Sequence, residues 1–353
     1  MTMPRSLRVG AGSGVPMPSR MVCFGELLLR LSAPGREMLL QSPRLQVHVG
    51  GAEANVAVSL AKLGHAVSMV SLIPDNPLGH AAVGELRRHG VDTRHVALAP
   101  GRMGLYFLVT GAIHRSSEVL YDRAGSSFAT NAAALDAGDA LDGADALHVS
   151  GVTPALGPEA AAAAQRAMAA AHKLGLFISF DCNYRARLWE AWRGDAPRIL
   201  RELVGLAGVV FGSARDLALI LEQGFGSAGT VDEFRQAGEA AFAAFPGLKR
   251  VATTVRRQKS VDHHDISAWM LTRDGLFVGR DYAVGPIVDR IGTGDAFAAG
   301  ILHGLQRGMG EEQTVNFGLA AACLKHSIPG DFNLVGEADV HALMDDSDYA
   351  VRR

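Results

Sequence analysis

The chain has 353 residues, of which 48% are hydrophobic and 20% charged, so it can bury the core of one large α/β domain or two smaller ones. Its formal net charge of -2 and its 6% of aromatic residues argue against binding to nucleic acid or to an anionic membrane. The three cysteines lie far apart, which excludes a disulfide framework and indicates a reducing, cytoplasmic location.

The two ends of the chain are expected to lie outside the folded domain. Residues 1–20 are rich in Gly, Pro and Ser and lack the apolar region of a secretory signal, so we predict a disordered tail. Residues 346–353 are expected to form a C-terminal tail, and residues 21–345 one folded domain. No stretch of about twenty apolar residues occurs, so no membrane span is expected.

Short apolar strands alternate with amphipathic helices along most of the chain, and glycines stop several of the helices. This alternation predicts a mainly parallel central sheet covered by helices on both faces. Strands are predicted for residues 20–32, 66–73, 144–150, 176–183, 208–213 and 249–255, and an extended segment for 282–288. Helices are predicted for residues 53–64, 78–90, 157–175 and 296–308.

Two segments, residues 31–49 and 104–127, break this alternation. They are shorter and more polar, and the strands at 104–110 and 116–123 have no helix between them. Strands without intervening helices predict a small antiparallel appendage on the main sheet. The appendage could be a lid that closes over a ligand or a plain surface hairpin, and the residues favour neither.

The stretch VDRIGTGDAFAAG, residues 288–300, places a carboxylate behind two glycines where a loop becomes a helix. Gly292 and Gly294 let a ligand approach the backbone, and the free N–H groups and dipole of a helix N-terminus attract an anion such as phosphate. Asp295 beside such an anion hole has the position of a general base in phosphoryl transfer. The alternative is that Asp295 is the N-cap of an ordinary helix, because Asp is favoured there.

Two widely separated motifs resemble the paired signatures of the PfkB, or ribokinase-like, carbohydrate kinases: GGAEANVAVSLAKLG at residues 50–64 and GTGDAFAAG at residues 292–300. Four further segments resemble a narrower branch, the 2-keto-3-deoxygluconate kinases. These segments are YDRAGSS, SGVTPAL, DCNYRARLW and CLKHSIPGDFNLV, which begin at residues 121, 150, 181 and 323. The resemblance extends from about residue 21 to residue 344.

The resemblance implies a three-layer α/β/α fold with a small β-sheet lid, and transfer of the γ-phosphate of ATP to a sugar hydroxyl with Mg²⁺. It implies that Asp295 is the catalytic base and that the N–H groups of Gly292, Thr293 and Gly294 form the anion hole. It also implies six residues around the sugar: Gly51, Asn55, Tyr106, Tyr121, Arg123 and Arg185.

The arginines among them suit a sugar acid, because Arg binds a carboxylate through two parallel hydrogen bonds. Arg123 lies on the expected lid, and Arg185 follows a main-sheet strand. Tyr106 and Tyr121 offer a ring face and a hydroxyl to a sugar. The alternative for each arginine is a surface ion pair, which is the usual role of the residue.

The sequence departs from the family pattern in two places that concern the nucleotide. Where the family often has Asn-x-x-Glu, linked to Mg²⁺ and phosphate, this chain has Ser213 and Asp216, and we expect Asp216 to be the metal ligand. The usual glycine-rich nucleotide segment is replaced by TTVRRQKS at residues 253–260, whose Thr254, Arg256 and Lys259 either reach ATP phosphates or belong to a solvated loop. The DHHD segment at residues 262–265 is expected to be a solvated loop rather than a metal site.

The function that the sequence predicts is ATP-dependent phosphorylation of the terminal, 6-hydroxyl of 2-keto-3-deoxygluconate. One alternative is a related kinase for another sugar or sugar acid, such as a fructokinase-like enzyme. Another is a non-catalytic sugar-acid sensor on the same fold, which the altered Ser213–Asp216 pair leaves open. The expected partners are the sugar acid and ATP, without nucleic acid or membrane, and the chain is expected to form a homo-oligomer.

Overall fold

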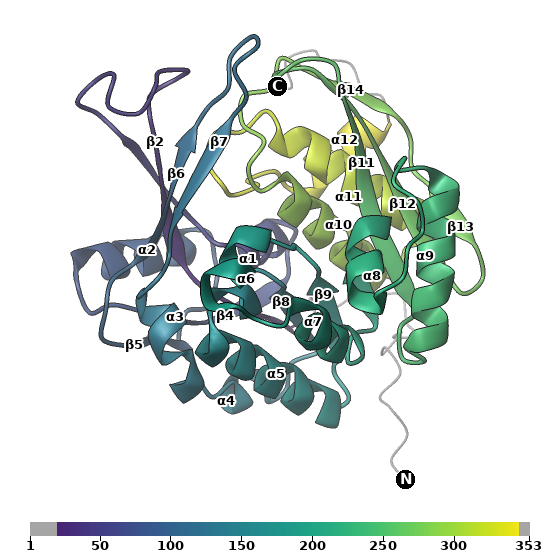
Figure 1. Ribbon diagram of the computed structural model, residues 1–353, viewed down its shortest axis with the longest axis horizontal. Coiled ribbons are helices and arrows are strands. Elements are labelled where there is room, and N and C mark those ends of the chain that lie inside the picture. Colours follow the sequence, from purple (N-terminus) through teal and green to yellow (C-terminus); the bar gives the residue numbers. More distant parts are fainter. Residues whose placement is uncertain (1–19, 346–353) are drawn as a thin grey trace.

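The computed structural model describes residues 20–345 (Figure 1). The two predicted tails therefore lie outside the described residues, except for Arg20, which begins the first strand. No helix within residues 20–345 combines the length and the apolar character that crossing a bilayer requires.

The main sheet has ten strands, of which seven adjacent ones pair in parallel. The other three, formed by residues 264–284, are antiparallel to the strands that they join. Across the sheet the order is β13 (Leu276–Val278), β12 (His264–Thr272), β11 (Arg250–Gln258), β10 (Val209–Phe211), β9 (Phe177–Asp181), β8 (Ala146–Ser150), β1 (Arg20–Phe24), β4 (Ala66–Ile73) and β5 (Val96–Leu98), with β14 (Tyr282–Val284) beside β12.

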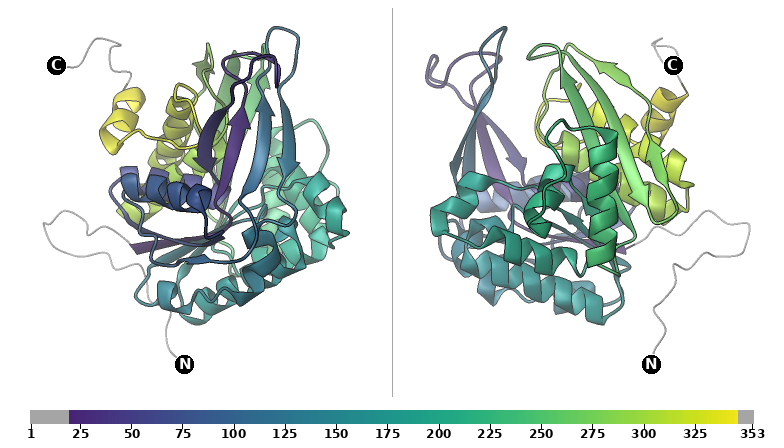
Figure 2. Two further views of the ribbon diagram at one scale, coloured as in Figure 1. Left: turned by 90° about the vertical axis from the view of Figure 1, so that its left-hand side faces the viewer. Right: turned by 45° about the vertical axis from the view of Figure 1, so that its right-hand side comes forward.

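Helices cover both faces of this sheet, as the alternating pattern predicts (Figures 1 and 2). One face carries α1 (Ala52–Lys62), α2 (Pro77–Arg88), α10 (Thr293–Arg307) and α11 (Glu311–Lys325), and α12 (Glu337–Met344) packs outside α11. The other carries α3 (Ser127–Asn131), α4 (Gly138–Leu141), α5 (Pro158–Lys173), α6 (Ala186–Trp192), α7 (Ala196–Val204), α8 (Ala214–Leu221) and α9 (Val231–Ala244).

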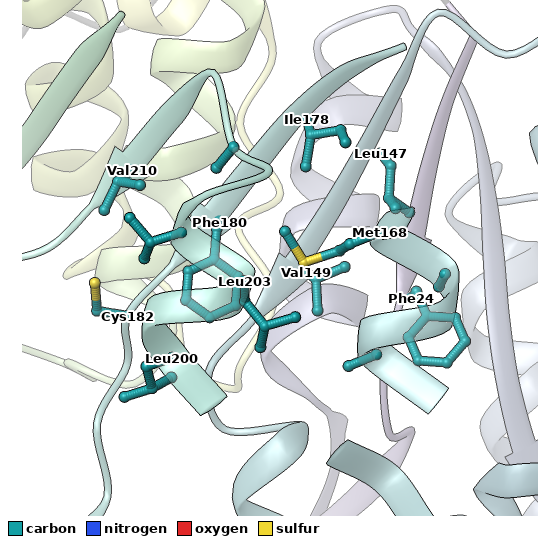
Figure 3. Close-up of a cluster of buried hydrophobic side chains, with 14 of the residues drawn as sticks. Phe24, Leu147, Val149, Met168, Ile178, Phe180, Cys182, Leu200, Leu203 and Val210 are labelled. Atoms are coloured by element: carbon teal, nitrogen blue, oxygen red, sulfur yellow. The ribbon is translucent and has the colours of Figure 1, made fainter. Parts of the chain in front are cut away.

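The core follows from the strand period of two. In β1, Val22 and Phe24 enter the cluster under α5 and α7, whereas Met21 and Cys23 enter the cluster under α1 and α10. Figure 3 shows the first cluster, where β-strand side chains such as Phe180 meet helix side chains such as Leu203. This arrangement confirms the predicted three-layer α/β/α fold.

A smaller sheet of four strands stands at one side of the body (Figure 2, left). Its order is β3 (Gln46–Gly50), β2 (Leu28–Ser32), β6 (Gly104–Val109) and β7 (Glu118–Asp122). The segments that break the alternation supply β3, β6 and β7, whereas β2 comes from residues predicted as part of a main-sheet strand. The expectation of an antiparallel appendage is wrong in one respect: β2 and β6 pair in parallel, because residue order runs the same way in both, from Leu28 beside Gly104 to Ser32 beside Leu108.

The prediction of one strand over residues 20–32 is also wrong. The chain leaves the main sheet after Phe24 and enters the smaller sheet at Leu28, so the segment forms two strands in two sheets. Between them Glu26 is 1% exposed, and its carboxylate lies where a side chain at Gly104 would stand. This crossing joins the smaller sheet to the end of β1.

Candidate active site

In the turn before α10, the backbone lies very close to neighbouring groups. Gly292 is the N-cap of the helix, its φ is 78°, and a side chain there would overlap the backbone oxygen of Asp331, so glycine is required. Asp295 is the third helical residue, so the alternative that Asp295 is itself the N-cap is wrong. Gly292 has no side chain to satisfy the first N–H groups of the helix, and space around Gly294 is open within 4 Å of a Cβ position. The turn can therefore receive an anion.

Asp295 faces the first signature motif across the site. The Asn55 amide on α1 donates to the Asp295 carboxylate, with 2.6 Å between Nδ2 and Oδ2. Burial raises the pKa of Asp295 to about 6, against the hydrogen bond from Asn55, which lowers it. At neutral pH the group is thus mostly a carboxylate whose proton affinity is higher than usual, as a general base requires.

Asn55 has a second polar atom that points to a ligand. The residue is 4% exposed, and its Oδ1 is buried without a hydrogen-bond partner within residues 20–345. A buried amide oxygen of this kind normally has a donor. A sugar hydroxyl beside Asp295 would supply one. The nearby Gly51 has a φ of 140°, and a side chain there would overlap the backbone oxygen of Glu26, so the chain can enter α1 here only with glycine.

Arg185 remains accessible next to this pair. It is the N-cap of α6, it is exposed, and its Nη1 donates to the backbone oxygen of Tyr184 at 3.2 Å. Its positive charge lowers the pKa values of Asp295 and Asp181, so the guanidinium lies on the side of the site that those carboxylates share. This placement suits a group that binds an anionic substrate.

Arg123 is placed differently. It is 5% exposed, and its Nε donates to the buried carboxylate of Glu26, at 2.6 Å from Oε2. Ser126 donates to the other Glu26 oxygen. Arg123 thus has a buried ion pair at the base of the smaller sheet, in addition to any contact that its remaining nitrogens make with a substrate.

Replacing Arg123 with Leu should therefore destabilise the fold. The change leaves the Glu26 carboxylate buried without its partner, a loss of about 3–5 kcal/mol in free energy of unfolding by urea titration. Arg94→Leu, which removes an exposed ion pair with Asp92, is the matched control and should cost less than about 1 kcal/mol. Adding Glu26→Gln to Arg123→Leu should recover part of the loss. Unchanged stability with a raised KM would instead make Arg123 a substrate ligand alone.

Tyr106 and Tyr121 lie opposite each other on β6 and β7. Tyr106 is 7% exposed, and its hydroxyl donates to the Asp331 carboxylate at 2.6 Å, so this hydroxyl already has a partner within the protein. Tyr121 is half-buried, and both it and Ile291 pack against the buried cluster of Leu28, Tyr106 and Leu108. The smaller sheet thus turns an aromatic surface toward the loop that precedes Gly292.

Ser213 and Asp216 form a capping box at the start of α8. The backbone N–H and the hydroxyl of Ser213 both donate to Asp216 Oδ2 at 2.7 Å. Both hydrogen bonds go to Oδ2, and within residues 20–345 the other Asp216 oxygen has no such bond from Ser213. Asp181, at the end of β9, is electrostatically coupled to Asp216, and burial followed by the charge of Asp295 raises the pKa of Asp181 to about 8.

The carboxylates of Asp216 and Asp181 are candidate ligands for Mg²⁺. Within residues 20–345, no three His, Cys, Asp or Glu side chains converge to hold a metal ion. Mg²⁺ that is bound with a nucleotide needs only one or two protein carboxylates, because phosphate and water supply the other ligands. Asp216 with Asp181 nearby fits that requirement.

Residues 253–258 form part of β11 rather than a loop, so the solvated-loop alternative is wrong for them. Thr254 and Arg256 are exposed and alternate on one face of the strand, and Arg256 is close enough to Arg290 for the two charges to interact. Lys259 is paired with Asp265 at 2.6 Å. In the DHHD segment, His264 is 1% exposed on β12, so the expectation of a fully solvated segment is wrong there.

Three further residues at the site were not predicted as functional. Asp181, Lys325 and Asp331 all lie in segments that resemble the kinase branch, DCNYRARLW and CLKHSIPGDFNLV. Lys325 is 0% exposed and Asp331 is 2% exposed. A charged residue at the end of an apolar run, LAAACLK, was the available signal for Lys325.

Comparison with known proteins adds to this geometry. The family model described as pfkB family carbohydrate kinase matches residues 18–255 and 268–333. A 2-dehydro-3-deoxygalactonokinase of Haloferax volcanii is 31% identical over 96% of this chain and 100% of its own. A 2-dehydro-3-deoxygluconokinase of Bacillus subtilis is 28% identical over 88% of this chain and 91% of its own.

Two solved structures are also similar to this chain over most of its length. The 2-dehydro-3-deoxygluconokinase of Thermotoga maritima has a TM-score of 0.88 at 34% identity, and covers 93% of this chain and 99% of its own. A PfkB family carbohydrate kinase of Listeria grayi has a TM-score of 0.86 at 38% identity, and covers 93% of this chain and 100% of its own.

Proposed function

Because the chain belongs to the pfkB family of carbohydrate kinases, we propose that it phosphorylates the terminal, 6-hydroxyl of 2-keto-3-deoxygluconate with ATP. The observation that carries the proposal is the pair formed by Asp295, a carboxylate with a raised pKa behind a helix N-terminus, and Arg185, an exposed arginine beside it. The first provides the chemistry of phosphoryl transfer, and the second provides a partner for the carboxylate of a sugar acid. The names of the Bacillus and Thermotoga relatives support the same substrate class.

In the proposed reaction, Asp295 accepts the proton of the sugar hydroxyl while that oxygen bonds to the γ-phosphorus of ATP. The bond between the γ-phosphorus and the bridging oxygen of ADP breaks, and ADP leaves with the electron pair. The N–H groups at the start of α10 stabilise the charge on the transferring phosphoryl group. Asn55 orients Asp295 through its Nδ2 and holds the sugar through its free Oδ1.

The nucleotide is expected on the other side of the turn. Thr254 and Arg256 on β11 form an exposed polar face near Arg290, which suits the phosphates of ATP. Mg²⁺ supplies charge neutralisation at the phosphates when it is bound, and Asp216 is the carboxylate we expect to hold it. A cytoplasmic location and a homo-oligomeric state stay predictions.

Asp216→Ala should raise the Mg²⁺ concentration needed for half-maximal activity, because hard cations prefer carboxylate oxygens. The substrate KM should change less. The substitution also removes the capping box and should lower stability by about 1 kcal/mol. Asp216→Asn keeps an oxygen that accepts the Ser213 hydrogen bonds and separates the two effects. If neither variant changes the Mg²⁺ midpoint, Asp216 has only its structural role.

A panel of substrates tests the proposal. ADP release would be measured with 2-keto-3-deoxygluconate, its galactonate epimer, 5-keto-2-deoxygluconate, fructose and ribose. The highest kcat/KM should be found for 2-keto-3-deoxygluconate. The Haloferax relative makes the galactonate epimer the second candidate. A preference for a neutral sugar would replace the proposal with another sugar kinase activity, and no ADP release with any of them would favour a sensor.

A further inference from the structure

A group of buried charged side chains lies directly behind the Gly292 turn, and the proposed mechanism does not use it. Arg30 on β2 pairs with Asp289 at 2.6 Å and with Asp331 at 3.1 Å, and Lys325 ends α11 beside them. Arg30, Lys325 and Asp331 are no more than 2% exposed. Burial of charge is costly, and a well-packed apolar group of the same volume is often as stable. Stability alone is therefore a weak reason for this group.

Asp331 touches both signature motifs. Its backbone oxygen occupies the place of a Gly292 side chain, and its carboxylate occupies the place of a Gly50 side chain. The same carboxylate accepts the hydrogen bond of Tyr106 and faces Arg30, both from the smaller sheet. Asp331 thus joins the turn that carries Asp295, the motif that carries Gly50 and the strands of the smaller sheet.

Lys325 lies under the same turn. A Cβ at Gly292 would be 3.5 Å from the Lys325 Cε, and the ammonium donates to the backbone oxygen of Ile328 at 2.9 Å. That acceptor is neutral, so the charge of Lys325 acts on the carboxylates around it, which are Asp289, Asp331 and Asp295. Burial lowers the pKa of Lys325 to about 8, so below that pH a positive charge lies behind N–H groups that already favour an anion.

We propose that Lys325 and Asp331 are positioning residues of opposite charge, which hold the turn from Gly292 to Asp295 and set the electrostatic environment of the Asp295 carboxylate. The inference rests on the proposed role of Asp295 as the general base. Neither residue touches the substrate in this account. Both act through the turn and through the field at Asp295.

The two charges have opposite effects on Asp295. Burial raises the pKa of Asp295 to about 6; the negative charge of Asp331 adds to that rise, and the positive charge of Lys325 opposes it. A general base works when it is deprotonated, so kcat should fall as pH drops through this pKa. The other charged or titratable groups that face Asp295 or Lys325 are Arg30, His48, Asp181, Arg185, Asp289 and His326.

The test is the pH dependence of kcat for Lys325→Met and Asp331→Asn, measured from pH 5 to 9 with saturating sugar acid and ATP. Burial also raises the pKa of Asp331 to about 6, so its negative charge is only partly present across the acid limb. Asp331→Asn should therefore move that limb to lower pH by up to about one unit, because Asp295 then loses its proton more readily. Lys325→Met should move it to higher pH by about one unit. Arg250→Met is the matched control: it breaks the ion pair with Glu311 at the opposite end of α11 and should leave the limb in place.

The outcomes separate the two proposals. Reduced kcat with an unmoved limb in both variants would give them a merely structural role and overturn the inference. A limb that moves equally in Arg250→Met would also overturn it. If thermal unfolding shows that Lys325→Met does not fold, the direction in which the acid limb moves in Asp331→Asn decides whether the inference holds. If Asp295→Asn loses turnover but the acid limbs of Lys325→Met and Asp331→Asn do not move, the proposed function stands and this inference fails. Normal turnover in Asp295→Asn would overturn the proposed function itself.

Discussion

Asp295→Asn should lower kcat by about 10²–10⁴-fold, which is the usual contribution of a positioned general base. The amide cannot accept the proton of the sugar hydroxyl, although its oxygen can still accept the hydrogen bond from Asn55. ATP and sugar should therefore bind nearly as well as in the original protein. The measurement is steady-state ADP release, with ATP binding followed separately by calorimetry.

Stability provides the control for this variant. Burial raises the folded-state pKa of Asp295 to about 6, above its ordinary value of 3.8, so the ionised carboxylate is disfavoured in the folded state. This penalty is absent at low pH and is fully present above about pH 6. At pH 8 the neutral Asn should thus keep or raise the melting temperature. Near-normal turnover in a folded variant would exclude Asp295 from the chemistry.

Arg185→Leu should raise KM for 2-keto-3-deoxygluconate by about 10–100-fold. A charge-assisted hydrogen bond contributes about 1.5–3 kcal/mol, and a two-pronged arginine–carboxylate pair more. Arg185 is exposed, so its removal should have little effect on stability. The ratio of kcat/KM for the sugar acid to that for a matched neutral sugar should fall accordingly.

Two further variants serve as controls for this experiment. Arg185→Lys keeps the charge but not the two-pronged geometry, and it should give an intermediate KM. Arg187→Leu removes a second exposed arginine on the same helix and should change neither substrate's kcat/KM. Equal losses on the acid and the neutral sugar in Arg185→Leu would mean that the arginine supports the fold or the nucleotide, and the sugar-acid assignment would lose its physical basis.

The sequence predicted those parts of the fold that depend on local pattern. The strand at Ala66–Ile73 has the predicted bounds because its apolar run is limited by glycine and proline, and the helix after Gly292 follows from apolar spacing behind a glycine turn. The same local logic failed at residues 20–32. Gly25 and Glu26 interrupt an apolar run there, and the two halves join different sheets.

The candidate site was predictable to the extent that its residues lie in motifs. Asn55 and Asp295 are 240 residues apart and meet at 2.6 Å, and only the resemblance to known kinases indicated that they would. The buried pairs could not be predicted, because a charged residue in a sequence does not reveal its partner. Arg123 pairs with Glu26, which is 97 residues away in the sequence, and Arg30 pairs with Asp289, which is 259 residues away. Burial and pairing are properties of the packed fold.

The central claim is that the Asp295 carboxylate directs the γ-phosphate of ATP onto the terminal hydroxyl of a sugar acid that Arg185 holds. Phosphorus and carbon NMR of the product formed from ATP and 2-keto-3-deoxygluconate tests it most directly. The account predicts one phosphomonoester whose phosphorus couples to C6, formed in a one-to-one ratio with ADP. An ester at another carbon, or inorganic phosphate and ADP with unchanged sugar acid, would contradict it.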